Sequence, residues 1–189
     1  MRLRLIIGPM FSGKTSELIS HYNRLLTSNI NPSEILVINH SFDTRYSSRF
    51  IATHNEITDI ECDMMSKIMP ITKQTIEKNN YKAILINEGQ FFDDLNYWIK
   101  YLIRSKVDIE IIVSGLDADF KQEPFGDFLN IIPYCYSVEK LTSICSKCFK
   151  KKAEMTIRMS DNKEQVLIGN QTIYKPICSD CITDQPIVA

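Results

Sequence analysis

An apolar run that ends in a glycine-containing loop constrains the fold of this chain more than any other feature. The run Leu3–Ile7 has the length of a buried strand, and the loop after it matches the pattern G-x-x-x-x-G-K-[ST]. The loop consists of Gly8, Pro9, Met10, Phe11, Ser12, Gly13, Lys14 and Thr15. From Gly13 to about Ser28 the leucines recur at helical spacing. A strand, this loop and a helix in succession are the context that a phosphate-binding loop requires, and a chance match would lack that context.

Each fixed residue of the loop has a chemical reason. Gly8 and Gly13 permit backbone angles that turn successive N–H groups toward phosphate oxygens, and the following helix points its positive end at the anion. Lys14 can reach the β and γ phosphates, and the Thr15 hydroxyl can bind Mg²⁺. The motif alone does not identify the nucleotide or the acceptor of the phosphoryl group.

The remaining apolar runs predict an α/β fold. Runs of strand length lie at Glu34–Asn39, Lys82–Asn87 and Ile109–Gly115, and a helix with one apolar face is predicted at Asp93–Ser105. A weakly helical stretch precedes the second of these runs. The segment His40–Cys62 is polar and has no clear period, so we expect a long loop there. Strands that alternate with helices imply a parallel sheet covered on both faces.

The C-terminal part of the chain carries two Cys-x-x-Cys pairs. They are Cys145 with Cys148, and Cys178 with Cys181. In a chain without an export signal, paired cysteines predict metal ligands rather than disulfides, and four thiolates suit a closed, structural Zn²⁺ site. The two isolated cysteines, Cys62 and Cys135, are expected to be ordinary thiols. The change of pattern places a domain boundary near residue 140.

The charge balance argues against nucleic acid as a partner. The chain has 22 basic and 23 acidic residues and a formal net charge of −1, whereas a broad nucleic-acid footprint needs a basic face. The basic stretch Lys147–Lys152 is interpreted as a solvated loop, so a ribbon that binds nucleic acid is the poorer alternative. The apolar runs are too short to span a membrane, and the N-terminal one is too short for the core of a secretory signal. We therefore expect a cytoplasmic protein.

The third predicted strand ends in a carboxylate. It runs directly into Asn87 and Glu88. Glu88 is expected at the C-terminal edge of the sheet, where open α/β folds bind ligands, and it could accept a proton from an attacking hydroxyl. The alternative is a surface carboxylate with no role, which the nearby phosphate loop makes less attractive.

Several motifs that follow one another in order resemble those of the type II thymidine kinases, the family found in animal cytosol, bacteria and several large DNA viruses. The motifs are GPMFSGKT, DTRYS at Asp43–Ser47, Thr53-His54, NEGQFF, GLDADF at Gly115–Phe120, EPFG at Glu123–Gly126 and the four paired cysteines. The resemblance extends from Leu3 to Cys181. One motif could arise by chance, but this series is highly specific.

The resemblance implies both a fold and an activity. The fold would be a P-loop, RecA-like parallel sheet over residues 1–140, followed by a small zinc-ribbon or lasso domain over residues 141–189 that closes over the nucleoside. The activity would be transfer of the γ-phosphoryl group of ATP to the 5′-hydroxyl of thymidine. The implied cofactors are structural Zn²⁺ and Mg²⁺ bound with ATP. The resemblance also implies a homotetramer and feedback inhibition by thymidine triphosphate.

Roles for individual residues also follow from the resemblance. Glu88 matches the general base, Arg45 and Lys14 match residues at the transferred phosphoryl group, and Thr15 matches the Mg²⁺ ligand. Beyond the phosphate loop, the phosphate-binding residues implied are Asp43, Thr44, Arg45, Asn87, Glu88, Gly89 and Gln90. The nucleoside-binding residues implied are Met10, Phe91, Leu116, Phe120, Phe125, Thr156, Gln165, Val166, Leu167, Ile168, Gly169 and Tyr174.

The chain departs from the family pattern at two positions. Asn87 stands where the family usually has aspartate; its amide oxygen can still accept a hydrogen bond from Mg²⁺-bound water, but the charge is missing. We hypothesise that Thr15 and the nucleotide phosphates hold Mg²⁺, with Glu88 or Asp43 supplying the missing charge. Asn170 stands where relatives often have glycine, and asparagine tolerates left-handed geometry.

Two other functions stay open as alternatives. One is a P-loop ATPase whose zinc ribbon binds nucleic acid, and the other is a binding-only relative disabled by Asn87. The presence of Lys14, Thr15, Arg45 and Glu88 argues against the second alternative. The sequence does not rank thymidine against deoxyuridine, or ATP against other phosphoryl donors.

Overall fold

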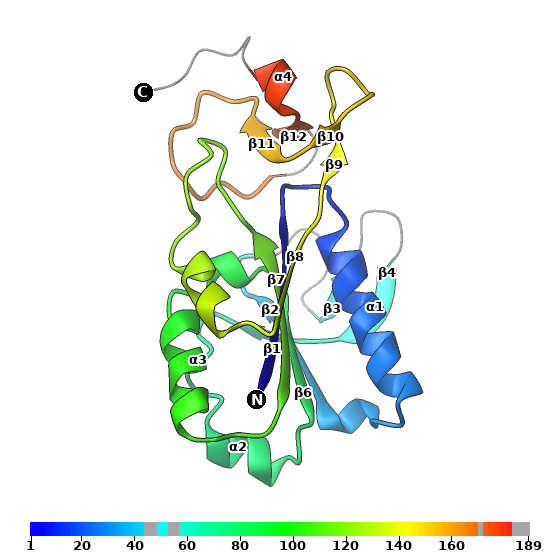
Figure 1. Ribbon diagram of the computed structural model, residues 1–189, viewed down its shortest axis with the longest axis vertical. Helices are drawn as coiled ribbons and strands as arrows, with labels where there is room; N and C mark the ends of the chain where they lie inside the picture. Colours follow the sequence, from blue (N-terminus) through cyan, green and yellow to red (C-terminus); the bar gives the residue numbers. More distant parts are fainter. Residues whose placement is uncertain (44–48, 53–56, 170–171, 183–189) are drawn as a thin grey trace.

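A six-stranded sheet forms the centre of the computed structural model, which describes residues 1–43, 49–52, 57–169 and 172–182 (Figure 1). Its strands are β1 (Arg2–Gly8), β2 (Ile35–His40), β5 (Asp63–Met65), β6 (Ala83–Ile86), β7 (Glu110–Leu116) and β8 (Ser137–Lys140). They lie in the order β5-β2-β6-β7-β1-β8, and every neighbouring pair is parallel. The carboxyl ends of all six strands therefore meet at one edge.

Helices cover both faces of this sheet. The α-helices beside it are α1 (Lys14–Thr27), α2 (Lys73–Lys78) and α3 (Leu95–Arg104), and the short 3-10 helices are η1 (Pro32–Glu34), η2 (Gly89–Phe91) and η3 (Phe128–Tyr134). Figure 1 shows α1 and α3 on opposite faces. Among the described residues, no helix is both long enough and apolar enough to pass through a bilayer.

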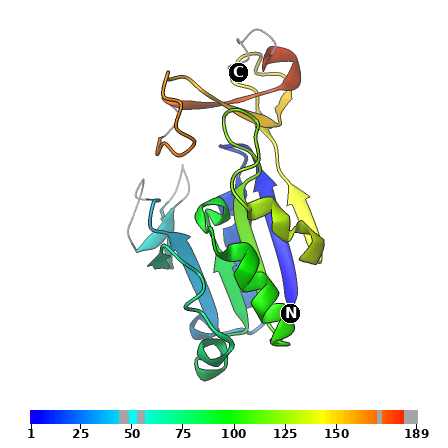
Figure 2. The ribbon, with the colours of Figure 1, turned by 90° about the vertical axis from the view of Figure 1, so that its left-hand side faces the viewer.

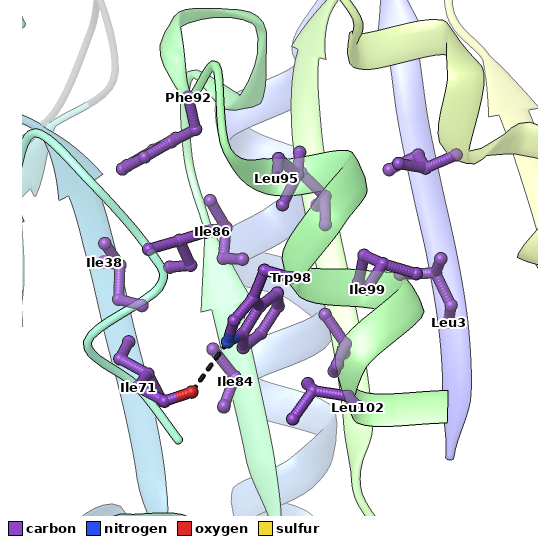
Figure 3. Packing of buried hydrophobic residues seen from close by; sticks show 14 of the residues in the cluster. Leu3, Ile38, Ile71, Ile84, Ile86, Phe92, Leu95, Trp98, Ile99 and Leu102 are labelled. Carbon is purple, nitrogen blue, oxygen red and sulfur yellow. Dashed lines mark hydrogen bonds between the residues drawn. The ribbon is translucent and has the colours of Figure 1, made fainter. Parts of the chain in front are cut away.

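Trp98 lies at the centre of the core between α3 and the sheet (Figure 3). It is fully buried together with Leu95, Ile99 and Leu102, which follow the i, i+3, i+4, i+7 spacing of one helix face. The sheet residues packed against them include Leu3, Ile38, Ile84 and Ile86. The indole N–H of Trp98 donates to the carbonyl of Ile71 at 2.7 Å, so the one polar atom of this large side chain is also satisfied.

The opposite face of the sheet is covered by α1. Leu18, Ile19 and Leu25 of this helix are buried against a second apolar cluster, which includes Ile6 of β1 and Val37 of β2. Alternate residues of β1 and β2 thus enter different cores. Burial on both faces explains why these strands read as continuous apolar runs rather than as an alternating pattern.

The structure confirms the predicted α/β class, the parallel sheet and the four strands that were predicted for it. Each end of β1, β2, β6 and β7 lies one residue from its predicted position. The helices predicted around α1 and α3 are also present. These elements were predictable because each contains enough apolar residues in sequence to define its own buried face.

The prediction of a long loop at 40–62 was wrong. This segment contains β3 (Phe50–Ala52) and β4 (Ile57–Glu61), which pair in an antiparallel manner. The edge strands β5 and β8 were also missed. β8 has the sequence SVEK and its residues are half-buried or exposed, because an edge strand covered on few sides needs no apolar run. Its place in the sheet depends on pairing with β1.

The C-terminal part consists of small β-ladders around its own apolar cluster. Its elements are β9 (Ser143–Ile144), β10 (Lys152–Ala153), β11 (Met155–Arg158), β12 (Tyr174–Ile177) and the short helix α4 (Ser179–Ile182). β9 pairs with β10 and β11 pairs with β12, both antiparallel. Figure 2 shows this part beyond the carboxyl edge of the central sheet, which is the edge where a parallel sheet binds ligands.

Replacement of Trp98 by phenylalanine is expected to destabilise the protein by about 2–4 kcal/mol, because it leaves a cavity and removes the donor to the Ile71 carbonyl. Urea unfolding followed by circular dichroism measures this change. Tyr97→Phe is the matched control, since Tyr97 is 68% exposed, and its effect should stay within about 0.5 kcal/mol. Equal stability of both variants would contradict this description of the core.

Candidate active site

One cleft at the carboxyl edge of the sheet gathers residues from five distant segments of the chain. The phosphate loop contributes Met10, Phe11, Ser12, Gly13, Lys14, Thr15 and Ser16. The ends of the sheet strands and the segments after them contribute Phe42, Asp43, Asn87, Glu88, Gln90, Phe91, Leu116, Ala118, Asp119, Phe120 and Phe125. The C-terminal part contributes Thr156, Arg158, Gln165, Val166, Leu167, Ile168, Gly169 and Tyr174. Most of the residues proposed from the sequence thus line one cleft.

The phosphate loop has the backbone that its two glycines allow. Gly8 has φ +150°, and a Cβ atom there would lie 2.4 Å from the carbonyl oxygen of Leu141. Gly13 has φ +84° and immediately precedes α1. Both conformations are strained for other residues, so the glycines set the curvature of the loop at the helix N-terminus. Gly8 and Pro9 shape the loop from outside the lining of the cleft.

Lys14 lies over the phosphate loop. Its ammonium donates to the carbonyl of Pro9 at 2.5 Å and to the hydroxyl of Ser12 at 3.4 Å, while Thr15 follows it in the lining of the cleft. The carbonyl and hydroxyl of these two partners are neutral acceptors. Phosphate oxygens form stronger, charge-assisted hydrogen bonds with an ammonium, so this geometry suits an incoming phosphate.

Glu88 projects from a tight turn directly after β6. It has left-handed backbone angles, φ 55° and ψ 43°, which cost a residue with a side chain roughly 1–2 kcal/mol. The amide nitrogen of Gln90 donates to the Glu88 carboxylate at 2.6 Å, and the amide oxygen of Gln90 accepts from the N–H of Leu116 at 2.9 Å. Gln90 therefore links this carboxylate to the end of β7.

Gly89 lies behind the cleft rather than in its lining. A Cβ atom there would lie 2.6 Å from Val113 and 2.7 Å from the ring of Phe128, so close packing explains this glycine. The sequence analysis assigned Gly89 to phosphate binding, and that assignment stays a prediction, since the packing around its Cα does not test it. Thr44 and Arg45, together with His54 and Asn170, lie outside the described residues.

The side chain of Asn87 takes part in a buried hydrogen-bond network. Its amide oxygen accepts from the hydroxyl of Ser114 at 2.9 Å, and its amide nitrogen donates to Asn39 at 3.1 Å. Asn39 in turn donates to the carboxylate of Asp43 at 3.1 Å. Asn39 and Ser114 were not identified from the sequence, where they look like ordinary strand residues. Only the pairing of β2, β6 and β7 brings the three strand residues together.

Aromatic rings form one wall of the cleft. The ring of Phe91 makes edge-to-face contacts with Phe125, at a centroid distance of 5.5 Å, and with Phe42, at 5.9 Å. Phe120 lies against the guanidinium of Arg158, whose Cζ atom is 3.7 Å from the ring centroid. Such faces offer apolar area to a planar ligand, as in many small-molecule sites.

Arg158 organises the segment that crosses the cleft, and sequence reasoning missed it. Its guanidinium donates to the carbonyls of Asn162, Glu164 and Gln165 and to the hydroxyl of Tyr174. That hydroxyl donates to the carbonyl of Leu167 at 2.7 Å. Arginine suits this place because its planar fork offers five donors in fixed directions. The sequence contained one indication of this role, which was an arginine next to the apolar residues of a short strand.

Two hydrogen bonds join the phosphate loop to the C-terminal part. The N–H of Met10 donates to the hydroxyl of Thr156 at 2.9 Å, and the hydroxyl of Ser143 donates to the carbonyl of Phe11 at 3.0 Å. A third link crosses the cleft, since Gln165 donates to the carboxylate of Asp119 at 2.9 Å. Asp119 is a further residue of the cleft that the sequence analysis did not assign to the site.

The four paired cysteines converge as a metal site requires. The sulfur atoms of Cys145, Cys148, Cys178 and Cys181 all lie within 4.8 Å of one another. A tetrahedral Zn²⁺ with bonds of about 2.3 Å separates its sulfur ligands by about 3.8 Å, so the cluster fits this ion. Such a closed shell leaves no position for catalysis.

Electrostatics also favour a cation in this cluster. Burial raises the pKa of Cys145, but backbone N–H groups of Cys148, Cys178 and Lys147 lower it to a net value of about 6. A side-chain hydrogen bond with Cys178 raises the pKa of Cys181 to about 12. Thiolates this close to one another repel, and a bound cation would offset their charge.

The two isolated cysteines differ from these four. Burial raises the pKa of Cys62 and of Cys135 to about 11, so both are neutral thiols at physiological pH. This agrees with the expectation that they are ordinary thiols.

Comparisons with known proteins indicate the family of this chain. The family model described as "Thymidine kinase" matches residues 1–182. A thymidine kinase of Mycoplasma mobile is 36% identical over 95% of this chain and 86% of its own length. The cytosolic thymidine kinase of Homo sapiens is 35% identical over 95% of this chain and 72% of its own, and the Vaccinia virus enzyme is 34% identical over 96% and 97%. The chain therefore belongs to the thymidine kinase family.

Proposed function

We propose that this protein is an ATP-dependent thymidine kinase that transfers the γ-phosphoryl group of ATP to the 5′-hydroxyl of thymidine. The observation that carries the proposal is the single cleft in which a phosphate loop, the Glu88 carboxylate and an aromatic wall face one another. These are the three parts that phosphoryl transfer to a nucleoside needs: a phosphate cradle, a proton acceptor and a surface for the base.

In the proposed mechanism Glu88 is the general base. Its carboxylate accepts the proton of the 5′-hydroxyl as the oxygen attacks the γ-phosphorus, and the bond from that phosphorus to the β-bridging oxygen breaks. The hydrogen bond from Gln90 holds the carboxylate in place during this step. Lys14 and the loop N–H groups stabilise charge on the phosphates, and we assign a similar role to Arg45.

Mg²⁺ is the proposed partner of ATP, and the residues at hand fit it. Thr15, Asp43, Asn87 and Glu88 all line the same cleft and present oxygen atoms, which Mg²⁺ prefers. We assign Thr15 as the residue that holds the ion together with the nucleotide phosphates. When bound, Mg²⁺ supplies charge that offsets the negative charge of the β and γ phosphates.

The segment Gln165–Gly169 is the proposed cover for the nucleoside. It lines the same cleft as Phe91 and Phe125, and its backbone is held by Arg158 and Tyr174. Backbone groups in a fixed position can distinguish bases, whereas aromatic walls contribute contact area.

Zinc is proposed to support this cover rather than to act in the reaction. β12 leads directly from Tyr174 to Cys178, so a bound Zn²⁺ would fix the strand that carries the cover. The last strand of the sheet ends at Lys140 and β9 begins at Ser143, which supports a division into parts 1–140 and 141–189. A homotetramer, a cytoplasmic location and feedback inhibition by thymidine triphosphate remain parts of the proposal.

A nucleoside panel with radiolabelled ATP tests the proposed function directly. Purified protein should label thymidine, and Glu88→Gln should lower kcat by about 100-fold to 10,000-fold while ADP binding stays unchanged, because glutamine cannot accept the proton. Glu77→Gln on α2 is the control and should keep full activity. A fully active Glu88→Gln enzyme would refute the mechanism, and ATP hydrolysis stimulated by DNA without labelled thymidine would refute the function.

Arg158→Lys is expected to raise KM for thymidine by about tenfold or more, because one ammonium cannot replace the fork that holds three carbonyls. The affinity for ADP alone should stay close to that of the unchanged protein. The control is Arg24→Lys, whose side chain on α1 is 59% exposed. Equal KM values for the two variants would remove Arg158 from nucleoside binding.

Loss of one zinc ligand should separate the structural metal from catalysis. Cys178→Ser is expected to reduce bound zinc from about one ion per chain to a small fraction and to weaken thymidine binding. Elemental analysis and equilibrium binding measure these two effects. Cys135→Ser, outside the cluster, should keep its zinc. Full zinc content in Cys178→Ser would show that these four residues are not the ligands.

A further inference from the structure

A chain of hydrogen bonds behind the cleft ends at the carboxylate of Asp43. It starts at Ser114 on β7, passes through Asn87 after β6 and Asn39 on β2, and reaches Asp43, with donor–acceptor distances of 2.9, 3.1 and 3.1 Å. The exposed fractions of these four side chains are between 1% and 8%. Buried amides are costly unless their hydrogen bonds are made, so this network fixes the side chains that compose it.

The direction of the chain is fixed by a backbone group. The N–H of His40 donates to the amide oxygen of Asn39 at 3.1 Å, and a backbone N–H cannot act as an acceptor. The oxygen of Asn39 therefore faces His40 and Asn87, and its NH₂ group faces Asp43. Every donor along the chain points toward the carboxylate, which can only accept.

This direction gives a reason for asparagine at position 87. An aspartate there would place a carboxylate oxygen against the amide oxygen of Asn39, and both groups are acceptors. Turning the Asn39 amide would repair that contact, but it would set an oxygen against Asp43 and take the acceptor from His40. The network is therefore consistent with a neutral residue at 87 and one negative charge at Asp43.

We propose that Asn39 is a positioning residue that orients the Asp43 carboxylate at the metal and nucleotide side of the cleft. The backbone N–H of His40 sets the orientation of the Asn39 amide, and the Asn87 amide donates to the same oxygen. Asp43 lines the same cleft as Thr15, the residue assigned to Mg²⁺, so its carboxylate belongs to the cleft in which the ion is proposed to bind. The inference rests on the proposed Mg²⁺ site and specifies which carboxylate serves it. Of the two carboxylates considered from the sequence, it selects Asp43, which leaves Glu88 as the base.

The measurement is the gain in ADP affinity that Mg²⁺ produces. Isothermal titration gives the dissociation constant of ADP in excess Mg²⁺ and in EDTA, and the ratio of the two is the Mg²⁺-linked gain. Asn39→Leu, which removes the donor to Asp43, should lower this ratio by about tenfold, and Asp43→Asn should lower it equally. Because Asn39 acts through Asp43, the double variant should show no further loss.

A nearly isosteric variant separates positioning from simple charge. Asn39→Asp keeps an acceptor for His40 and Asn87 but sets an oxygen against Asp43. Added negative charge near a cation site would by itself raise the Mg²⁺-linked gain, whereas loss of the donor to Asp43 should lower it. We expect the lower value. Asn23→Asp on the exposed face of α1 makes the same charge change elsewhere and should leave the ratio unchanged.

The outcomes distinguish the inference from the function on which it rests. A cooperative melting transition and retained ADP binding in EDTA report whether each variant keeps its fold. An unchanged or higher Mg²⁺-linked gain in Asn39→Asp would overturn this inference but not the proposed function. The same conclusion would follow if Asn39→Leu lowered the gain as much in the Asp43→Asn protein as in the unchanged protein. A wild-type protein without any Mg²⁺-linked gain would overturn both this inference and the proposed Mg²⁺ site.

Discussion

The parallel pairing of β1 with β7 and β8 is the constraint on which the active-site cleft depends. It sets Gly8 beside Leu116, and the next residue after β8, Leu141, donates its N–H to Ile7 at 2.8 Å. A side chain on Gly8 would collide with the Leu141 carbonyl, so the phosphate loop and the start of the C-terminal part are in backbone contact. Because parallel strands end at one edge of the sheet, β8 brings the chain to the edge where the cleft lies. This short strand has no apolar run of its own, yet it determines where the C-terminal part with its cysteine cluster begins.

Beyond this backbone contact, the two halves of the cleft are joined by hydrogen bonds rather than by a shared apolar core. Thr156 accepts from Met10, Ser143 donates to Phe11, and Gln165 donates to Asp119. The apolar cluster of the C-terminal part is small and includes Cys145 and Cys178, two of the four clustered cysteines. A part with so little core gains stability from a metal more than a large domain does. β12 begins at Tyr174, ends directly before Cys178 and pairs with β11, which ends at Arg158, so one strand pair joins the cysteine cluster to the segment that lines the cleft.

The sequence was sufficient where the information is local and insufficient where it depends on distant partners. β1, the phosphate loop and α1 follow one another within the first 27 residues, and their apolar spacing and glycines define them. β8 lacks such a run and is held by pairing with β1, which lies far away in the sequence, while the short strands β3 and β4 are held by pairing with each other. The same distinction holds in the site. Glu88 and the cysteines were found because motifs contain them, whereas Arg158 and Asn39 belong to no recognised motif, and only the fold joins Arg158 to Tyr174 and Asn39 to Asn87.

The network around Asn87 shows how a departure from a family pattern can be internally consistent. A second carboxylate at this place would be buried close to Asp43, and separating two like charges from water carries a large free-energy cost. A chain of amides avoids that cost, because each amide offers both a donor and an acceptor and transmits direction without net charge. The charge then stays on a single residue that reaches the cleft. The network is also rigid, because each of its side chains has one permitted orientation, which the backbone N–H of His40 sets. A change at Ser114, Asn87 or Asn39 therefore alters the position of the Asp43 carboxylate.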